Sequence, residues 1–88
     1  RGIFPAFFNG VNNMEKMSLG GLPAYIIETK TGVDSGSTFI MGKRSWCPFP
    51  DRPYFTIRKD LVGTGYSGGH YDLGLVEAFE DLIERAGV

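Results

Sequence analysis

Residues 73–88, LGLVEAFEDLIERAGV, form the clearest element of the sequence. Their apolar side chains recur every three or four positions, which places them on one face of a helix; they are Leu75, Val76, Phe79, Leu82, Ile83 and Ala86. Asp72 stands at the expected N-cap, and Gly87 stands where a glycine commonly ends a helix. We therefore predict an amphipathic helix over residues 73–86, with its apolar face against a core.

The opposite side of the predicted helix is acidic. It carries Glu77, Glu80, Asp81 and Glu84. An ordinary solvated helix face has this composition, and that is the simpler interpretation. The alternative is a docking surface for a basic partner, because charge complementarity sets association rate and partner choice.

Three segments rich in β-forming residues precede the helix and supply the sheet that it needs as cover. They are LPAYIIET from Leu22, then Thr38–Trp46, then Tyr54–Val62. A turn at residues 30–37 joins the first two, and the proline-rich CPFPDRP joins the last two, since proline lacks the N–H that a ladder needs. In the third segment Phe55 and Ile57 alternate with more polar residues, as expected for a strand with one buried face.

The remaining segments are expected to be irregular. Pro5 and Gly10 interrupt the first region, in which Asn12 would open a short helical turn through Met17 and Gly20-Gly21 would end it. We therefore predict a single α+β domain over residues 1–88. Its parts are an irregular or short-helical N-terminal segment (1–21), a three-stranded antiparallel sheet of order β-β-β (22–62), a glycine-rich loop (63–72) and one C-terminal amphipathic helix packed on the sheet.

The glycine-rich stretch GTGYSGGHYD, residues 63–72, contains a literal G-x-G-x-x-G. A dinucleotide site also needs a helix that begins inside the motif and a second parallel strand, and neither fits here. The favoured interpretation is a turn, and we predict no cofactor. The alternative is a small-ligand or catalytic site at Ser67 and His70. These residues lie with Asp72 on one flexible stretch where nothing fixes a nucleophile–base geometry, so we predict no catalytic residue.

The composition excludes several classes of protein. One cysteine, Cys47, and one histidine can form neither an internal disulfide nor a structural zinc site, so no metal is predicted. The cysteine count suits a reducing compartment, and we expect a cytoplasmic protein. No run approaches the ~18 apolar residues of a membrane span, so no membrane partner is expected.

We predict a small non-enzymatic protein-binding domain: an adaptor, a subunit or an inhibitor. It would dock through an uncovered aromatic and basic sheet face or through the acidic helix, and homodimerisation is its simplest form. The predicted contact residues outside the helix are Trp46, Tyr54, Tyr66, Tyr71, Arg44 and Arg58. Nucleic-acid binding by the same face, with Lys43, Arg52 and Lys59, is the alternative that the net charge of −1 disfavours.

Overall fold

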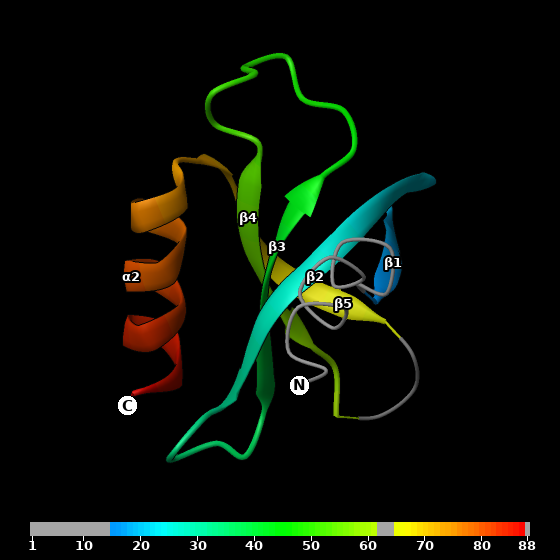
Figure 1. The fold of residues 1–88 in the computed structure, drawn as a ribbon. Helices are drawn as coiled ribbons and strands as arrows, with labels where there is room; N and C mark the ends of the chain where they lie inside the picture. Colours follow the sequence, from blue (N-terminus) through cyan, green and yellow to red (C-terminus); the bar gives the residue numbers. More distant parts are fainter. Residues whose placement is uncertain (1–14, 62–64, 88) are drawn as a thin grey trace, which may run out of the picture.

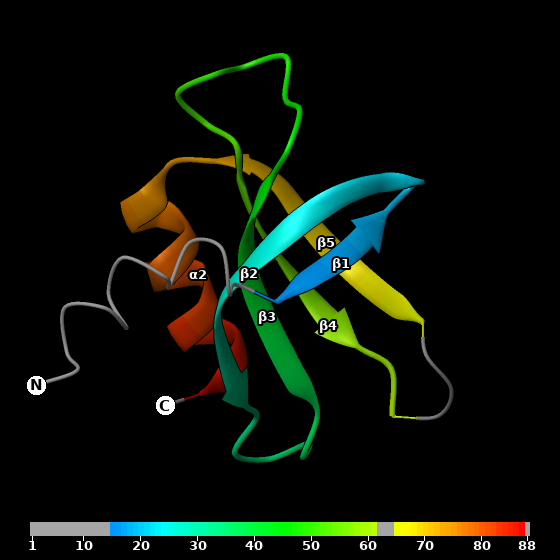
Figure 2. The same cartoon turned by 45° about the vertical axis from the view of Figure 1, so that its right-hand side comes forward.

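The computed structural model describes residues 15–61 and 65–87. These residues form five strands and one helix (Figure 1). The elements are β1 (Lys16–Leu19), β2 (Leu22–Thr31), β3 (Thr38–Arg44), β4 (Tyr54–Lys59), β5 (Tyr66–Leu73) and α2 (Leu75–Ala86). Each strand pairs antiparallel with the next, in the order β1-β2-β3-β4-β5, and the sheet curls into a half-barrel (Figure 2).

The predicted three-stranded sheet is therefore wrong, although its three segments correspond to β2, β3 and β4. Strand β3 ends at Arg44, before Trp46, and β4 ends at Lys59. One added strand, β1, lies in the region expected to be irregular. Gly20 and Gly21 have φ of 58° and 86°, and they form a two-residue turn that pairs Leu19 with Leu22. Two successive positive φ angles are what a tight hairpin turn requires, and glycine meets this need at no steric cost. The glycines thus close a hairpin instead of ending a helix; Met17 lies in β1, and residues 12–14 are outside the described part.

The second added strand, β5, occupies most of the predicted glycine-rich loop. It pairs with β4 from Lys59 opposite Tyr66 to Tyr54 opposite Leu73, with two shifts of register on the way. Glycine contributes no side chain to a sheet, so residues 66–70 carried little strand signal. Backbone hydrogen bonds to β4 hold this strand in place.

Both faces of the sheet are covered. On the side away from α2, where β1 and β5 curl round, the core contains Met17, Ala24, Ile40, Phe55 and Ile57. On the other side, Phe39 and Met41 pack against the buried residues of α2. Thr56 of β4 points to the α2 side and is fully buried, like Phe55 on the opposite side. The expectation that β4 buries one face only is therefore wrong.

The helix begins at Leu75, two residues later than predicted, and Asp72 lies in β5 instead of at the N-cap. Gly74 is the N-cap residue, and its N–H donates to Glu77 Oε1 at 3.0 Å. Gly87 ends the helix as predicted, with φ of 74°, and the N–H of Val33 in the β2–β3 loop donates to the carbonyl of Ala86. Among the residues described, no helix is long and apolar enough to cross a membrane.

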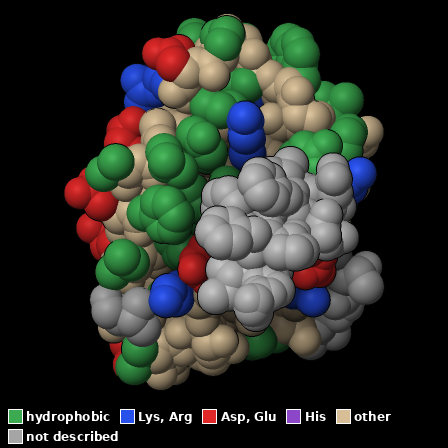
Figure 3. All heavy atoms as spheres, viewed as in Figure 1, with side chains coloured by type: hydrophobic (Ala, Val, Ile, Leu, Met, Phe, Trp, Pro, Cys, Tyr) green, Lys and Arg blue, Asp and Glu red, His purple; other side chains and the backbone are tan. Residues whose placement is uncertain are grey.

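Only part of the predicted apolar face of α2 is buried. The seam against the sheet consists of Ala78, Leu82 and Ala86. Leu75, Val76, Phe79 and Ile83 of the same predicted face are exposed. Figure 3 shows hydrophobic side chains gathered over this helix, with acidic side chains at the outer edge of the molecule.

Candidate functional site

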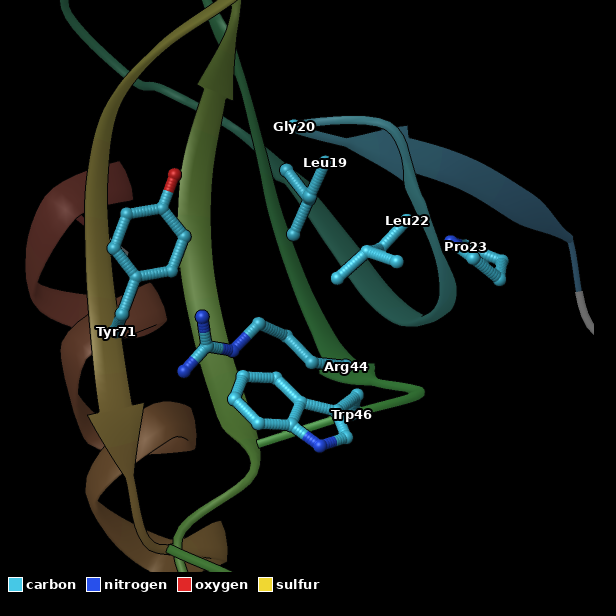
Figure 4. Close-up of a pocket in the computed structure, with 7 residues that line it drawn as sticks. All are labelled: Leu19, Gly20, Leu22, Pro23, Arg44, Trp46 and Tyr71. Atoms are coloured by element: carbon cyan, nitrogen blue, oxygen red, sulfur yellow. The ribbon is translucent and has the colours of Figure 1, made fainter. Parts of the chain in front are cut away.

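A groove with a volume of about 230 Å³ lies on the side of the sheet away from α2 (Figure 4). Residues from the β1–β2 hairpin, the end of β3, the loop after it and β5 line it together. They are Leu19, Gly20, Leu22, Pro23, Arg44, Trp46 and Tyr71. Because the half-barrel is open between its two end strands, the β1–β2 hairpin and β5 face one another across this groove.

The groove gathers large apolar side chains that the fold leaves exposed. Trp46 is 63%, Leu22 is 50% and Tyr71 is 42% exposed. A single exposed apolar residue is ordinary on a protein surface, whereas several around one depression mark a binding site. Trp and Tyr also combine a large apolar area with a polar group, which suits them to interfaces.

Arg44 lies at the floor of this aromatic cluster. Its guanidinium carbon lies 5.4 Å from the centre of the Tyr71 ring, and Figure 4 shows the group between Tyr71 and the Trp46 indole. Nη2 donates to Asp72 Oδ1 at 2.5 Å. Nε is buried and has no hydrogen-bond acceptor among the residues described. An unsatisfied buried donor is rare in folded proteins.

A network around Asp72 places Trp46 beside the groove. Asp72 has φ of 58°, which is uncommon for a residue other than glycine, and its carbonyl accepts a 2.9 Å hydrogen bond from Arg52 Nε. The Cys47 sulfur accepts from Arg44 Nη2 and from the Phe49 N–H, each at 3.4 Å. The loop that carries Trp46 is thus tied to β5 on both sides of the tryptophan.

The structure brings together three of the predicted contact residues, Arg44, Trp46 and Tyr71. It separates the others from them. Tyr54 packs with the α2-side core, and Tyr66 packs with the core on the other side. Arg58 donates to Ser67 Oγ at 2.9 Å, away from the residues that line the groove. The six predicted contact residues outside the helix therefore do not all line one surface.

The three arginines of the predicted sheet face are engaged with acidic or polar neighbours. Besides the Arg44–Asp72 pair, Arg52 Nη2 lies 3.1 Å from Glu77 Oε1. The Ser67 hydroxyl that Arg58 contacts donates in turn to Asp60 Oδ1 at 2.8 Å. A nucleic acid would have to compete with these partners for each guanidinium.

Ser67, His70 and Asp72 each contact a different partner and make no hydrogen bond to one another. Ser67 bonds to Asp60, Asp72 pairs with Arg44, and His70 Nδ1 lies 2.8 Å from Asp81 Oδ2 on α2. The described residues also contain no group of three or more His, Cys, Asp or Glu that is able to hold a metal ion.

Sequence reasoning missed the junction between α2 and the sheet. Asp81 Oδ2 accepts a hydrogen bond from the Thr56 hydroxyl and also contacts His70 Nδ1. Arg85 Nη1 donates to Thr56 Oγ1 at 3.1 Å. The carboxylate, not the imidazole, stands in the middle of this chain. The arrangement therefore joins helix to sheet and does not activate the buried hydroxyl as a nucleophile.

The ionisation of Asp81 reflects this junction. Burial, the largest single influence, raises the pKa of the carboxyl group. Hydrogen bonds with Thr56 and His70, together with the charges of His70 and Arg85, outweigh burial and lower the pKa below its ordinary value of 3.8.

Leu19, Leu22 and Pro23, which form the wall opposite Tyr71, were also missed. Leu-Gly-Gly-Leu is a hairpin signal, and it was the feature of the sequence from which this wall could have been predicted.

Comparisons of this chain with protein-family models, curated proteins and solved structures find no match. The chemistry of the groove is thus the basis for a proposal about function.

Proposed function

We propose that this domain is a non-enzymatic protein-binding module, and that its groove receives an apolar segment of a partner protein. The observation that supports this proposal most directly is that the exposed side chains of Trp46, Tyr71 and Leu22 lie around one groove. Tryptophan, tyrosine and arginine dominate interface energetics, and here all three are adjacent. Such a module serves as an adaptor, subunit or inhibitor, and the single cysteine makes a reducing compartment such as the cytoplasm part of this proposal.

The size of the groove favours a protein partner over a small free ligand. Its volume of about 230 Å³ is below the ~300–1,000 Å³ of typical small-molecule sites. A groove of this size accepts one or two side chains that belong to a larger partner. The Trp46 indole N–H and the Tyr71 hydroxyl lie on exposed side chains and supply hydrogen bonds to the backbone of such a segment.

The charge around the groove favours an apolar segment over a nucleic acid. Arg44 is neutralised by Asp72, and the nearby Arg52 is paired with Glu77. Affinity for nucleic acid depends on cations that are free to neutralise phosphates. Stacking of bases on Trp46 and Tyr71 would remain possible, but without free cations to neutralise the phosphates it gives only weak affinity for nucleic acid.

The test is a selection of random linear peptides on the full chain, followed by anisotropy measurements with the labelled peptides selected. Trp46→Ala and Tyr71→Ala are expected to weaken binding at least about tenfold, as central aromatic anchors do. Phe49→Ala is the matched control, because Phe49 is an exposed aromatic residue of the same loop that does not line the groove. Selected peptides that bind Trp46→Ala and Tyr71→Ala as tightly as the original chain would refute the proposal.

Light scattering with size exclusion, at low and high salt, distinguishes the kind of partner. A monomer that ignores added oligonucleotide supports a separate protein partner. A dimer that Tyr71→Ala dissociates would make a second copy of the chain the occupant of the groove. A salt-sensitive complex with oligonucleotide would favour the nucleic-acid alternative instead.

A further inference from the structure

The α2 helix carries a strip of exposed apolar side chains. Val76 is 69%, Ile83 is 46% and Phe79 is 36% exposed. Their spacing of three and four residues places them side by side along one flank of the helix, next to the buried seam of Ala78, Leu82 and Ala86. The strip is on a different face of the molecule from the groove, since the helix covers the opposite side of the sheet.

Acidic side chains border this strip. Glu80 lies four residues after Val76 and three before Ile83, so it stands at the outer margin of the strip. Glu84 follows it one turn further along. Neither forms an ion pair within the described residues; the pairs present there on α2 are those of Glu77 with Arg52 and of Asp81 with His70.

The charges determine which occupant fits. A second copy of the chain, helix against helix, would bring Glu80 and Glu84 of both copies together. Arg85, the basic residue of α2, does not reduce this repulsion, because its side chain is turned to the sheet. Its guanidinium lies 5.3 Å from the centre of the Phe39 ring and donates to Thr56. An anionic membrane surface would meet the same repulsion.

We propose that this strip and its acidic margin are a docking surface for a basic amphipathic helix of a partner protein. The apolar side of that helix packs on Val76, Phe79 and Ile83, and its lysine or arginine residues face Glu80 and Glu84. Helices in grooves are recognised in this manner, through apolar anchors at helical spacing. The apolar strip supplies affinity, whereas the carboxylates set the association rate and its dependence on salt.

The probe is a labelled synthetic peptide of about four helical turns, with leucine on one face and lysine along both margins. Two matched peptides serve as controls: one has glutamate in place of every lysine, and one has the same composition in scrambled order. Anisotropy with the full chain at low and high salt should show binding of the lysine peptide only. Binding of the glutamate or the scrambled peptide with equal affinity, or no binding of the lysine peptide, overturns the proposal.

Variants of the chain locate the binding. Phe79→Gln and Val76→Gln should each weaken the binding of the lysine peptide by about tenfold or more. Because Val76 is very exposed, its variant keeps the test valid if the Phe79 variant folds poorly. The double variant Glu80→Gln with Glu84→Gln should slow association and reduce its dependence on salt. Leu61→Gln is the control, because Leu61 is 72% exposed but is not on α2. Equal effects of Leu61→Gln and Val76→Gln, or a dimer of the chain that Val76→Gln dissociates, would contradict the proposal.

Discussion

At the scale of single residues, Thr56 connects two elements that hydrophobic packing alone would leave free to slide. It is fully buried on β4, donates to Asp81 and accepts from Arg85, and both partners lie on α2. A buried hydroxyl is stable only while such partners satisfy it. The orientation of the helix on the sheet therefore depends on this side chain as well as on the apolar seam.

We expect Thr56→Val to destabilise the domain by about 1–3 kcal/mol, because it keeps the shape but removes the hydroxyl that donates to Asp81 and accepts from Arg85. Urea unfolding monitored by circular dichroism measures this loss. Thr29→Val on the exposed surface of β2 is the matched control and should change the free energy of unfolding by less than ~0.5 kcal/mol. Equal effects of the two substitutions would show that the junction does not stabilise the fold.

Asp81 makes the stability dependent on pH. Its pKa is lower in the folded chain than the ordinary 3.8, so its contribution is complete above that value and is lost as pH falls through the folded pKa. The difference in unfolding free energy between the original chain and Asp81→Asn should therefore shrink on acidification below about pH 4. A difference that stays constant across this range would mean that the folded and unfolded pKa values are the same.

Trp46 is expected to be dispensable for the fold. Its side chain is largely exposed, so Trp46→Ala should change the free energy of unfolding by less than ~0.5 kcal/mol. Thermal unfolding by circular dichroism is the measurement. A cooperative transition that disappears in Trp46→Ala would assign this residue to the core and remove it as a binding anchor.

The sequence allowed Arg44, Trp46 and Tyr71 to be chosen as contact residues from their chemistry, but it did not show that they meet. Their proximity depends on β5, which brings Tyr71 opposite the end of β3. Tyr54 and Tyr66 have the same chemistry and point into the two cores. Residue type alone cannot separate these cases, because the face that a strand residue occupies is fixed by pairing and register.

At the scale of elements, the helix was predictable because its periodicity and its glycine stop are local signals. The strands β1 and β5 were not, because each is held by pairing with a neighbouring strand and not by a strong β-propensity of its own residues. Strand β1 has only four residues, and β5 contains Gly68 and Gly69. Favourable β-propensity is largely a statement about side-chain packing, which such segments lack.

The close packing around β3 depends on Gly42, which pairs with Ile26 of β2 and Phe55 of β4. A methyl group at this position would lie 2.8 Å from Phe55 Cζ and would press on the Tyr25 carbonyl oxygen. We therefore expect Gly42→Ala to cost about 1–3 kcal/mol or more, as overpacking does in a buried site. Unfolding in urea is the measurement, and an unchanged midpoint would show that the sheet accommodates the methyl group at residue 42 without loss of stability.

At the scale of the whole molecule, a curled sheet with one helix on its outer side has both faces covered and still keeps an opening between its end strands. The β1–β2 hairpin and β5 border that opening, where Arg44, Trp46 and Tyr71 converge. The second exposed apolar surface, on α2, lies on the other side of the sheet.

The most direct test of the proposed groove is a nuclear magnetic resonance titration of the ¹⁵N-labelled full chain with a peptide from the selection. The chain has a single tryptophan, so one indole N–H signal reports the groove. We expect this signal and the backbone amides of Leu22 and Tyr71 to shift together and to saturate at the same peptide concentration. A peptide that binds and shifts amides of α2 or of the outer strand surfaces, while the Trp46 indole signal stays in place, would contradict the account.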